Sequence, residues 1–205
     1  MLVTTLCGGA LAENCYIAKD EATGLCALVD PGFVSLELDA AVQKERFAFI
    51  LLTHGHFDHA GAAAYYCRLT GAPLVCTEKE AALLTEPQLN LSAWFGGDPL
   101  CLVPDRTVRD GEEIAVGESI LTVMETPGHT ARSCCYRADS LLFAGDTLMA
   151  GSMGRTDFPT GDGVQMRSSL KKLRTLPDNI RVYSGHGSST TIGYEKQTNV
   201  YLCSL

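Results

Sequence analysis

Four strand-like segments of this chain run directly into short turns that carry histidine or aspartate. The most apolar of them, residues 47–52, continues into Thr53-His54-Gly55-His56-Phe57-Asp58-His59. The other three precede Pro127-Gly128-His129-Thr130, Gly145-Asp146-Thr147 and Gly185-His186-Gly187, so all five histidines of the chain follow such a segment. Functional side chains commonly lie on loops held by a rigid scaffold, and in α/β sheets they lie beyond the strand ends. The pattern therefore predicts a sheet-based fold whose turns converge on one site.

The remaining pattern predicts the layers of this fold. Apolar runs bounded by turn residues predict strands at 2–6, 15–18, 26–29, 47–52, 73–76, 119–125, 133–137, 140–144 and 181–184. Helical spacing predicts helices at 36–44, 61–69, 78–84, 164–176 and 194–201. Many strands with helices between them, in two similar halves, favour two sheets packed face to face with helices outside. We expect one α/β sandwich domain over residues 1–205.

The segment from residue 78 to residue 105 is the least regular part of the chain. A helix is expected at its start, and a loop-rich stretch with Trp94 and Gly96-Gly97 follows. Such a segment either borders a site or simply connects two elements, and the sequence leaves both readings open.

Composition excludes several classes of partner. The formal net charge is −8, which argues against nucleic acid and against an anionic membrane surface, because both attract basic patches. No apolar run approaches the length of a membrane span, and the N-terminus lacks the pattern of a secretory signal. The nine cysteines are an odd number without a Cys-x-x-Cys pair, so we interpret them as small buried hydrophobes in a reducing cytoplasm.

The spacing of the first motif suits metal binding. In an extended segment the side chains of residues i and i+2 point the same way, so His54 and His56 can bind one ion together. Asp58 and His59 lie where the chain turns into a helix, which redirects them to a second ion nearby. Neutral imidazole and carboxylate suit zinc first, and also iron or manganese.

The motif Thr53-His54-Gly55-His56-Phe57-Asp58-His59 resembles the His-x-His-x-Asp-His signature of the metallo-β-lactamase superfamily, and the three later turns occur in that family's order. Within the superfamily the chain is most similar to the short bacterial relatives of the type II glyoxalases, the hydroxyacylglutathione hydrolases. That similarity rests on Gly154-Arg155-Thr156-Asp157-Phe158-Pro159 and on Thr190-Thr191-Ile192-Gly193 with Glu195.

The resemblance implies a four-layered αββα fold and two divalent metal ions. It implies that the first ion is bound by His54, His56 and His129. It implies that the second is bound by Asp58, His59 and His186. Asp146 would bridge both ions, together with a water or hydroxide.

The sequence departs from the full-length type II glyoxalases after the last histidine. Only 19 residues follow His186 (205 − 186 = 19), so we expect the C-terminal helical domain that contacts glutathione to be missing. Arg155, Tyr194 and Lys196 are candidate replacement contacts to the substrate. Each has an equally good structural interpretation, and Arg155 in particular can pair with Asp157.

The expected reaction is attack of a metal-bridging hydroxide, oriented by Asp58, on the acyl carbon of a small-molecule thioester. All five histidines are assigned as ligands, which leaves no general acid. A thioester suits that arrangement, since a thiolate leaves without a proton. The alternative is a persulfide dioxygenase of the same fold, with one iron on His54, His129 and Asp146. A β-lactamase is disfavoured, because there is no export signal and Asp146 stands where many of those enzymes have cysteine.

Overall fold

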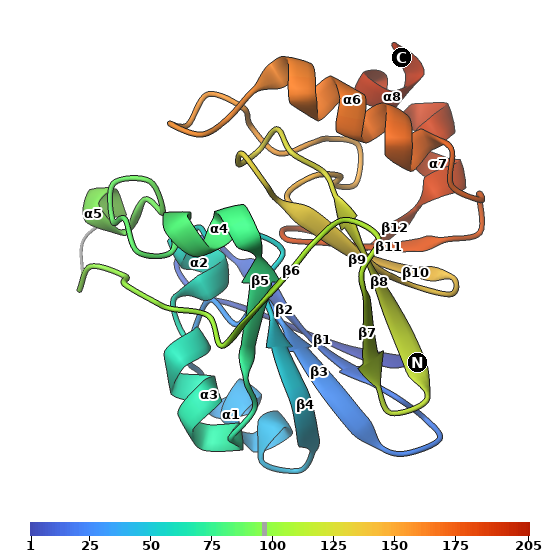
Figure 1. Ribbon diagram of the computed structural model, residues 1–205. Coiled ribbons are helices and arrows are strands. Elements are labelled where there is room, and N and C mark those ends of the chain that lie inside the picture. The colour runs from blue at the N-terminus through green and yellow to red at the C-terminus, as the bar shows by residue number, and fades with distance from the viewer. Residues whose placement is uncertain (96–97) are drawn as a thin grey trace.

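The computed structural model describes residues 1–95 and 98–205, which form two β-sheets packed face to face (Figure 1). The first sheet has its strands in the order β1 (Leu2–Gly8), β2 (Glu13–Lys19), β3 (Leu25–Val29), β4 (Arg46–Leu51), β5 (Leu74–Thr77) and β6 (Arg106–Val108). The second has the order β12 (Thr190–Thr191), β11 (Arg181–Ser184), β10 (Leu141–Gly145), β9 (Cys134–Ala138), β8 (Ser119–Glu125) and β7 (Glu113–Val116).

Helices cover both outer sides of this pair of sheets (Figure 1). The helices beside the first sheet are α1 (Leu36–Val42), α2 (Phe57–Ala60), α3 (Ala63–Thr70), α4 (Glu78–Leu83) and α5 (Ser92–Phe95). Those beside the second are α6 (Gly163–Arg174), α7 (Ile192–Thr198) and α8 (Val200–Cys203). The predicted αββα sandwich is thereby confirmed. Within the described ranges, no helix combines the length and the apolar character needed to cross a bilayer.

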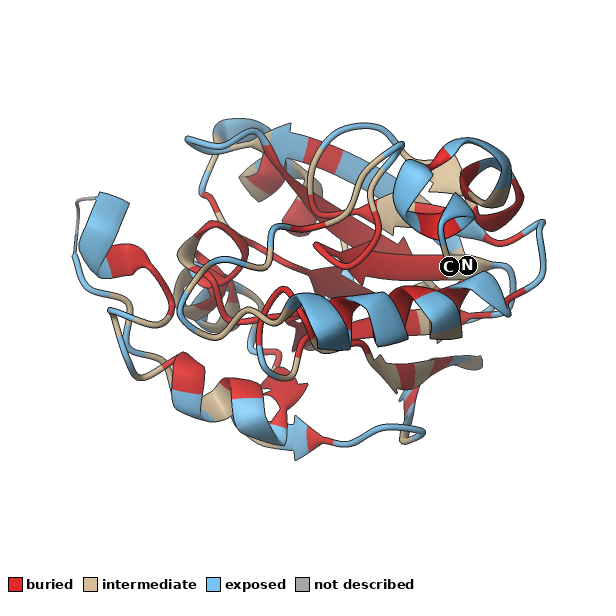
Figure 2. Ribbon diagram, turned by 90° about the horizontal axis from the view of Figure 1, so that it is seen from above, coloured by how far each residue is buried: buried red, intermediate tan, exposed pale blue. Residues whose placement is uncertain are grey.

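The period-two alternation of the strands builds the layers. In β3 the side chain of Leu28 packs toward the helices, whereas Val29 packs toward the opposite sheet. In β10 Phe143 faces the first sheet, and Leu142 faces the layer that contains α6. Both faces of these central strands are therefore buried, while the outer surfaces of the helices are exposed (Figure 2).

Helix α6 illustrates why the outer layer forms where it does. The Asp162 side chain caps it by accepting hydrogen bonds from the backbone N–H groups of Val164 and Gln165. Met166, Leu170 and Leu173 recur at helical spacing and are buried against the second sheet. Basic residues in the last turn complement the helix dipole.

Strand direction brings the motif-bearing turns together. β3 and β4 are parallel, so their carboxyl ends share one edge of the first sheet. β8 and β10 each pair antiparallel with β9, and β11 is parallel to β10, so these three strands run the same way. The carboxyl ends of the two sets of strands meet at the junction of the sheets.

Several predicted boundaries were wrong. The helix predicted over 61–69 starts at Ala63, because the Ala62 N–H bonds to the Pro31 carbonyl at 3.0 Å and a separate turn, α2, precedes it. The closing helix predicted over 194–201 is broken at Asn199, which is extended and caps α8 with its side chain. The short strands β6, β7 and β12 were missed. The Gly96-Gly97 pair lies outside the described residues.

Candidate metal centre

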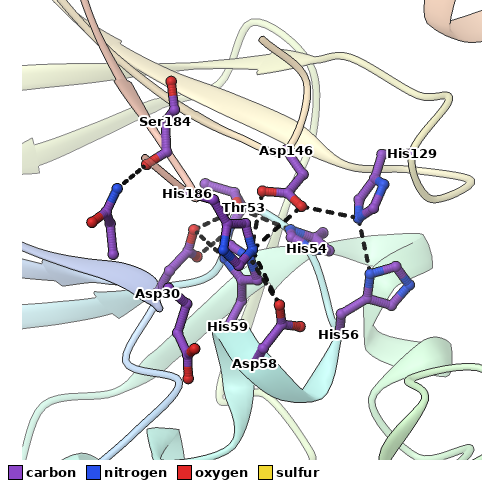
Figure 3. Close-up of polar contacts among 12 residues, drawn as sticks. Asp30, Thr53, His54, His56, Asp58, His59, His129, Asp146, Ser184 and His186 are labelled. Atoms are coloured by element: carbon purple, nitrogen blue, oxygen red, sulfur yellow. Dashed lines mark hydrogen bonds and ion pairs between the residues drawn. The ribbon is translucent and has the colours of Figure 1, made fainter. Parts of the chain in front are cut away.

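The seven side chains that the sequence singled out lie in one cluster at the junction of the sheets (Figure 3). One group, with ligand atoms within 4.8 Å of one another, is His54, His56 and His129. A second group with the same closeness is Asp58, His59 and His186. A third, formed by His54, His59 and Asp146, overlaps the other two. The structure thus brings together all seven predicted metal ligands, of which the first and last lie 132 positions apart in the sequence (186 − 54).

Asp146 occupies the middle of the cluster. Its Oδ1 lies 3.5 Å from Nε2 of His59, and its Oδ2 lies 3.5 Å from Nε2 of His129 and 3.7 Å from Nε2 of His186. The carboxylate therefore faces members of both three-residue groups (Figure 3).

The local backbone sets the directions of the first four side chains. His56 is extended (φ −66°, ψ 150°) and is the N-cap of α2, so His54 and His56 belong to an extended segment. Asp58 and His59 lie in the first turn of α2. This change from extended to helical backbone is the one that the sequence predicted, and it aims the two pairs of side chains at different parts of the cluster.

The turn that carries His186 is held from the other sheet. Asn14 donates from its side chain to the carbonyls of Ser184 (3.0 Å) and Gly187 (2.9 Å), and from its backbone to the Gly185 carbonyl (2.7 Å). A Cβ atom at Gly185 would lie 2.1 Å from Oδ1 of Asp146 and 2.5 Å from Cε1 of His59. Only glycine fits at this close approach.

Asp30, which the sequence analysis missed, orients two of the histidines. Its Oδ2 accepts the Thr53 hydroxyl at 2.7 Å and Nδ1–H of His59 at 3.1 Å, and its Oδ1 accepts the Thr53 N–H at 2.7 Å. The Thr53 oxygen in turn lies 3.1 Å from Nδ1 of His54. Because both Nδ1 atoms donate in these contacts, the Nε2 atoms of His54 and His59 face the cluster as its potential ligand atoms. Asp30 reaches this position at a left-handed backbone angle (φ 51°) that non-glycine residues rarely adopt.

We expect Asp30→Asn to weaken metal binding by about 10–100-fold while the chain still folds. An amide offers one acceptor oxygen to the three donors that the carboxylate now satisfies, so the His59 ring loses its fixed orientation. Competition with a chromophoric chelator measures the affinity. Asp39→Asn is the matched control, because Asp39 accepts two tyrosine hydroxyls away from the cluster. Equal affinities for the Asp30 variant and the control would contradict this role.

The donor set fits metal ions on the evidence of its own hydrogen bonding. His54 Nε2, His59 Nε2 and Asp146 Oδ1 are buried without a hydrogen-bond partner. The Arg155 carbonyl accepts Nδ1–H of His129 at 2.8 Å, which leaves Nε2 of His129 as a lone pair 3.0 Å from Nδ1 of His56. Buried polar atoms are rarely left unsatisfied, and this convergence of imidazole nitrogens and a carboxylate oxygen suits a cation bound among them.

The charges of the cluster favour positive charge at its centre. Burial alone would lower the pKa of His59, but the carboxylates of Asp58, Asp146 and Asp30 outweigh it and raise that pKa to about 10. Burial would raise the pKa of Asp58, yet His59 and the other neighbouring histidines hold it well below its usual range. The pKa of His54 is lowered by burial and by the other imidazoles, so His54 is neutral and fit to be a ligand.

Glu80 of α4 joins two of the turns and was also missed. Its carboxylate is 1% exposed and accepts the N–H of Gly55 at 2.9 Å, the hydroxyl of Thr130 at 2.6 Å and the N–H of Arg132 at 3.1 Å. Gly55 lies between His54 and His56, and Thr130 follows His129. One buried side chain therefore holds the turns that supply all three residues of the first group. Nothing in the sequence marks it, because a glutamate in a first helical turn normally faces solvent.

A cavity of about 340 Å³ opens onto the cluster. Its walls are His56, Asp58, His129, Asp146 and His186, together with Leu11, Phe57, Leu91, Phe95, Met149, Arg155 and Phe158. The segment that the sequence left undecided, residues 78–105, borders this cavity through Leu91 and Phe95.

The three predicted substrate contacts are distributed unevenly. Arg155 lines the cavity and also pairs with Asp157 at 2.6 Å, so both interpretations of this residue apply. Tyr194 lies beside Ala150 and Arg181 in a separate surface hollow. Lys196 donates to the Leu176 carbonyl at 2.7 Å and pairs with Asp178 at 2.6 Å. Only Arg155 is thus brought to the cluster.

Comparison with known proteins supports this picture. The chain is 33% identical to the hydroxyacylglutathione hydrolase GloC of Haemophilus influenzae over 200 residues, 94% of each chain. The crystal structure of the BLEG-1 B3 metallo-β-lactamase is similar at a TM-score of 0.91 and 31% identity, covering 98% of this chain and 99% of that one. The crystal structure of TTHA1623, solved in a di-iron-bound form, is similar at a TM-score of 0.87 and 33% identity. The match covers 97% of this chain and 100% of that one.

The family model named metallo-β-lactamase superfamily matches residues 8–186, which include most of both sheets and all seven clustered side chains. The chain therefore belongs to the metallo-β-lactamase superfamily.

Proposed function

We propose that this chain is a metal-dependent hydrolase of acyl-thioesters. In this proposal the group His54, His56 and His129 holds one divalent ion, and the group Asp58, His59 and His186 holds a second. Asp146 would supply a carboxylate to both ions, in keeping with its contacts to members of both groups. Zinc is the first candidate, with iron or manganese also suited to imidazole and carboxylate ligands.

One observation carries the choice of a thioester. Among the described residues that line the cavity, every side chain able to exchange a proton belongs to the two groups or is Asp146. The remaining charged residue is Arg155, whose guanidinium does not release its proton. An amine leaving group needs a proton from a general acid, whereas a thiol with a pKa of about 8.5 departs as the thiolate.

The chain's own residues would divide the remaining work. Two bound divalent ions supply Lewis acidity and a nucleophilic hydroxide at neutral pH. Asp58 lines the cavity and lies 3.2 Å from Nε2 of His186, so its carboxylate is placed to orient the attacking water. Apolar side chains on the cavity wall limit access of bulk water.

The similarity to a hydroxyacylglutathione hydrolase supports this proposal, since that name describes a thioester hydrolase. The similarity to BLEG-1 favours a second candidate, hydrolysis of β-lactams. The missing general acid argues against that candidate, because opening a β-lactam ring releases an amine nitrogen.

The test combines metal content with a substrate panel. We expect about two divalent ions per chain by mass spectrometry, as the two donor groups imply. We also expect turnover of S-lactoylglutathione that chelation abolishes and added zinc, manganese or iron restores. Turnover of thioesters by the chelated protein, with no bound metal, would overturn the proposal.

The same panel separates the competing functions. One iron per chain, with oxygen consumed in the presence of a persulfide, would establish the dioxygenase instead. Faster hydrolysis of a chromogenic cephalosporin than of any thioester would establish the β-lactamase. Retention of the Asp58, His59 and His186 group beside the first favours two ions over one.

A further inference from the structure

The walls of the cavity differ sharply from its floor. The floor consists of candidate metal ligands. Apart from those, the described lining is apolar, with the single exception of Arg155. The apolar lining residues are Leu11, Phe57, Leu91, Phe95, Met149 and Phe158. A site built this way recognises shape and apolar surface in the part of the substrate that extends beyond the reacting carbonyl.

Aromatic rings line the cavity. Phe57 and Phe95 are stacked with ring centroids 4.8 Å apart, which places the end of α5 against the start of α2. Phe158 lies edge-on to His56, with ring centroids 5.7 Å apart, and packs against Trp94 of α5 at 6.0 Å. Phe57, Phe95 and Phe158 line the same cavity as His56, so they border the space that a substrate would enter.

The rim of the cavity exposes apolar surface that the fold itself does not use. Phe95 is 50% exposed, Trp94 51% and Leu11 43%. They come from segments far apart in the sequence, the β1–β2 turn and α5, yet they gather at one opening. Exposed apolar residues that cluster beside a cavity indicate a ligand that covers them.

Arg155 is already paired with Asp157, so it contributes little to binding the polar groups of a substrate. Its guanidinium forms two hydrogen bonds to Asp157, at 2.6 and 2.8 Å, and lies over the Phe158 ring at 4.1 Å. Asp157 also holds the pKa of Arg155 above its usual range, so the pair stays ionised and mutually compensated. A paired, exposed cation contributes little to binding a carboxylate.

From these observations we propose that the enzyme selects an apolar or aromatic acyl group and discriminates little between thiols. This inference rests on the proposed thioester hydrolysis. The acyl arm packs against the cavity wall that contains Phe57, Phe95 and Phe158. The thiol carrier, for which the cavity provides one compensated cation, contributes little to specificity.

The first experiment varies one half of the substrate at a time with the metal-loaded, full-length protein. We expect kcat/KM to be at least about tenfold higher for S-phenylacetylglutathione than for S-acetylglutathione, since apolar pockets discriminate by roughly that factor per small group. Replacing glutathione by N-acetylcysteamine, with phenylacetyl kept, is expected to change kcat/KM by less than about fivefold.

A second experiment assigns the preference to the aromatic wall. In Phe95→Ala the ratio of the phenylacetyl to the acetyl kcat/KM is expected to fall about tenfold, because half of the stacked pair is removed. Tyr201→Ala is the matched control, since this aromatic side chain is similarly exposed, at 42%, on α8. Phe95 is half-exposed, so its replacement leaves the cores intact.

The outcomes distinguish the two proposals. If no thioester is hydrolysed by the metal-loaded protein, the proposed function fails. If acetyl, lactoyl and phenylacetyl thioesters react alike, or if Phe95→Ala leaves their ratio unchanged, the hydrolase stands and the apolar acyl specificity fails. A glutathione thioester favoured more than about tenfold over its N-acetylcysteamine counterpart would refute the claim about thiols.

Discussion

Asp146→Asn is expected to lower kcat/KM for thioester hydrolysis by about 10²–10³-fold or more, because it removes the charge at the centre of the cluster. The Asp146 carboxylate lies 3.5 Å from both His59 and His129, and its Oδ1 is buried without a hydrogen-bond partner. Asparagine has nearly the same shape, so packing at this position is kept. Steady-state kinetics measure the loss, and metal analysis should show fewer than two ions per chain.

The control for this substitution is Asp110→Asn. Asp110 is an exposed carboxylate that pairs with Lys172 on the surface, so the same chemical change there should leave the rate nearly unaltered. If the Asp146 variant retained both full metal content and wild-type turnover, this carboxylate would not contribute to catalysis. The assignment of the cluster as the catalytic metal site would then be wrong.

Glu80→Ala is expected to lower the free energy of unfolding by about 3 kcal/mol or more. The substitution leaves two buried donors and one partly buried donor without an acceptor, and each unsatisfied buried group costs about 1–3 kcal/mol. The donors are Gly55 N–H, Arg132 N–H and the Thr130 hydroxyl. Burial raises the pKa of Glu80, which means that the three hydrogen bonds hold a carboxylate in a place that otherwise disfavours its charge. Urea denaturation of the metal-loaded protein provides the measurement.

Glu78→Ala on the same helix is the matched comparison. Glu78 is exposed and pairs with Arg109 at 3.1 Å on the surface, so its loss should cost about 1 kcal/mol at most. Glu80→Gln should lower the free energy of unfolding by an amount between those of Glu78→Ala and Glu80→Ala, since its amide keeps one acceptor oxygen. If Glu78→Ala and Glu80→Ala unfolded at the same urea concentration, Glu80 would not hold the turns of the first group.

The fold could be predicted wherever apolar pattern alone determines an element. The strands expected at residues 119–125 and 181–184 have the observed bounds of β8 and β11, because their apolar runs end at clear turn residues. β6 and β12 could not be found this way, since both are very short. They exist because their neighbours β5 and β11 offer unpaired backbone groups, and this is a tertiary effect that local composition does not encode.

The site residues also separate into those that the local pattern reveals and those that depend on tertiary packing. Residues adjacent to a strand end, such as His129 and His186, were identified because the pattern repeats with flanking glycines. Asp30 follows β3 in the same manner, but Asp30-Pro31-Gly32 is also a typical turn sequence, so its position alone does not mark it as part of the site. Glu80 and Tyr194 depend on how helices pack. α4 turns a glutamate inward, whereas α7 leaves Tyr194 60% exposed and away from the cavity.

The meeting of the two sheets at the cluster has a consequence for the whole molecule. His54 to His59 belong to one half of the sandwich, whereas His129, Asp146 and His186 belong to the other. Ions seated there act as cross-links between the halves, so their binding free energy adds to cohesion of the entire domain by mass action. Tyr16 and Phe143 are in contact in the interior between the sheets. Substitutions that weaken this contact should therefore lower the affinity of the protein for metal.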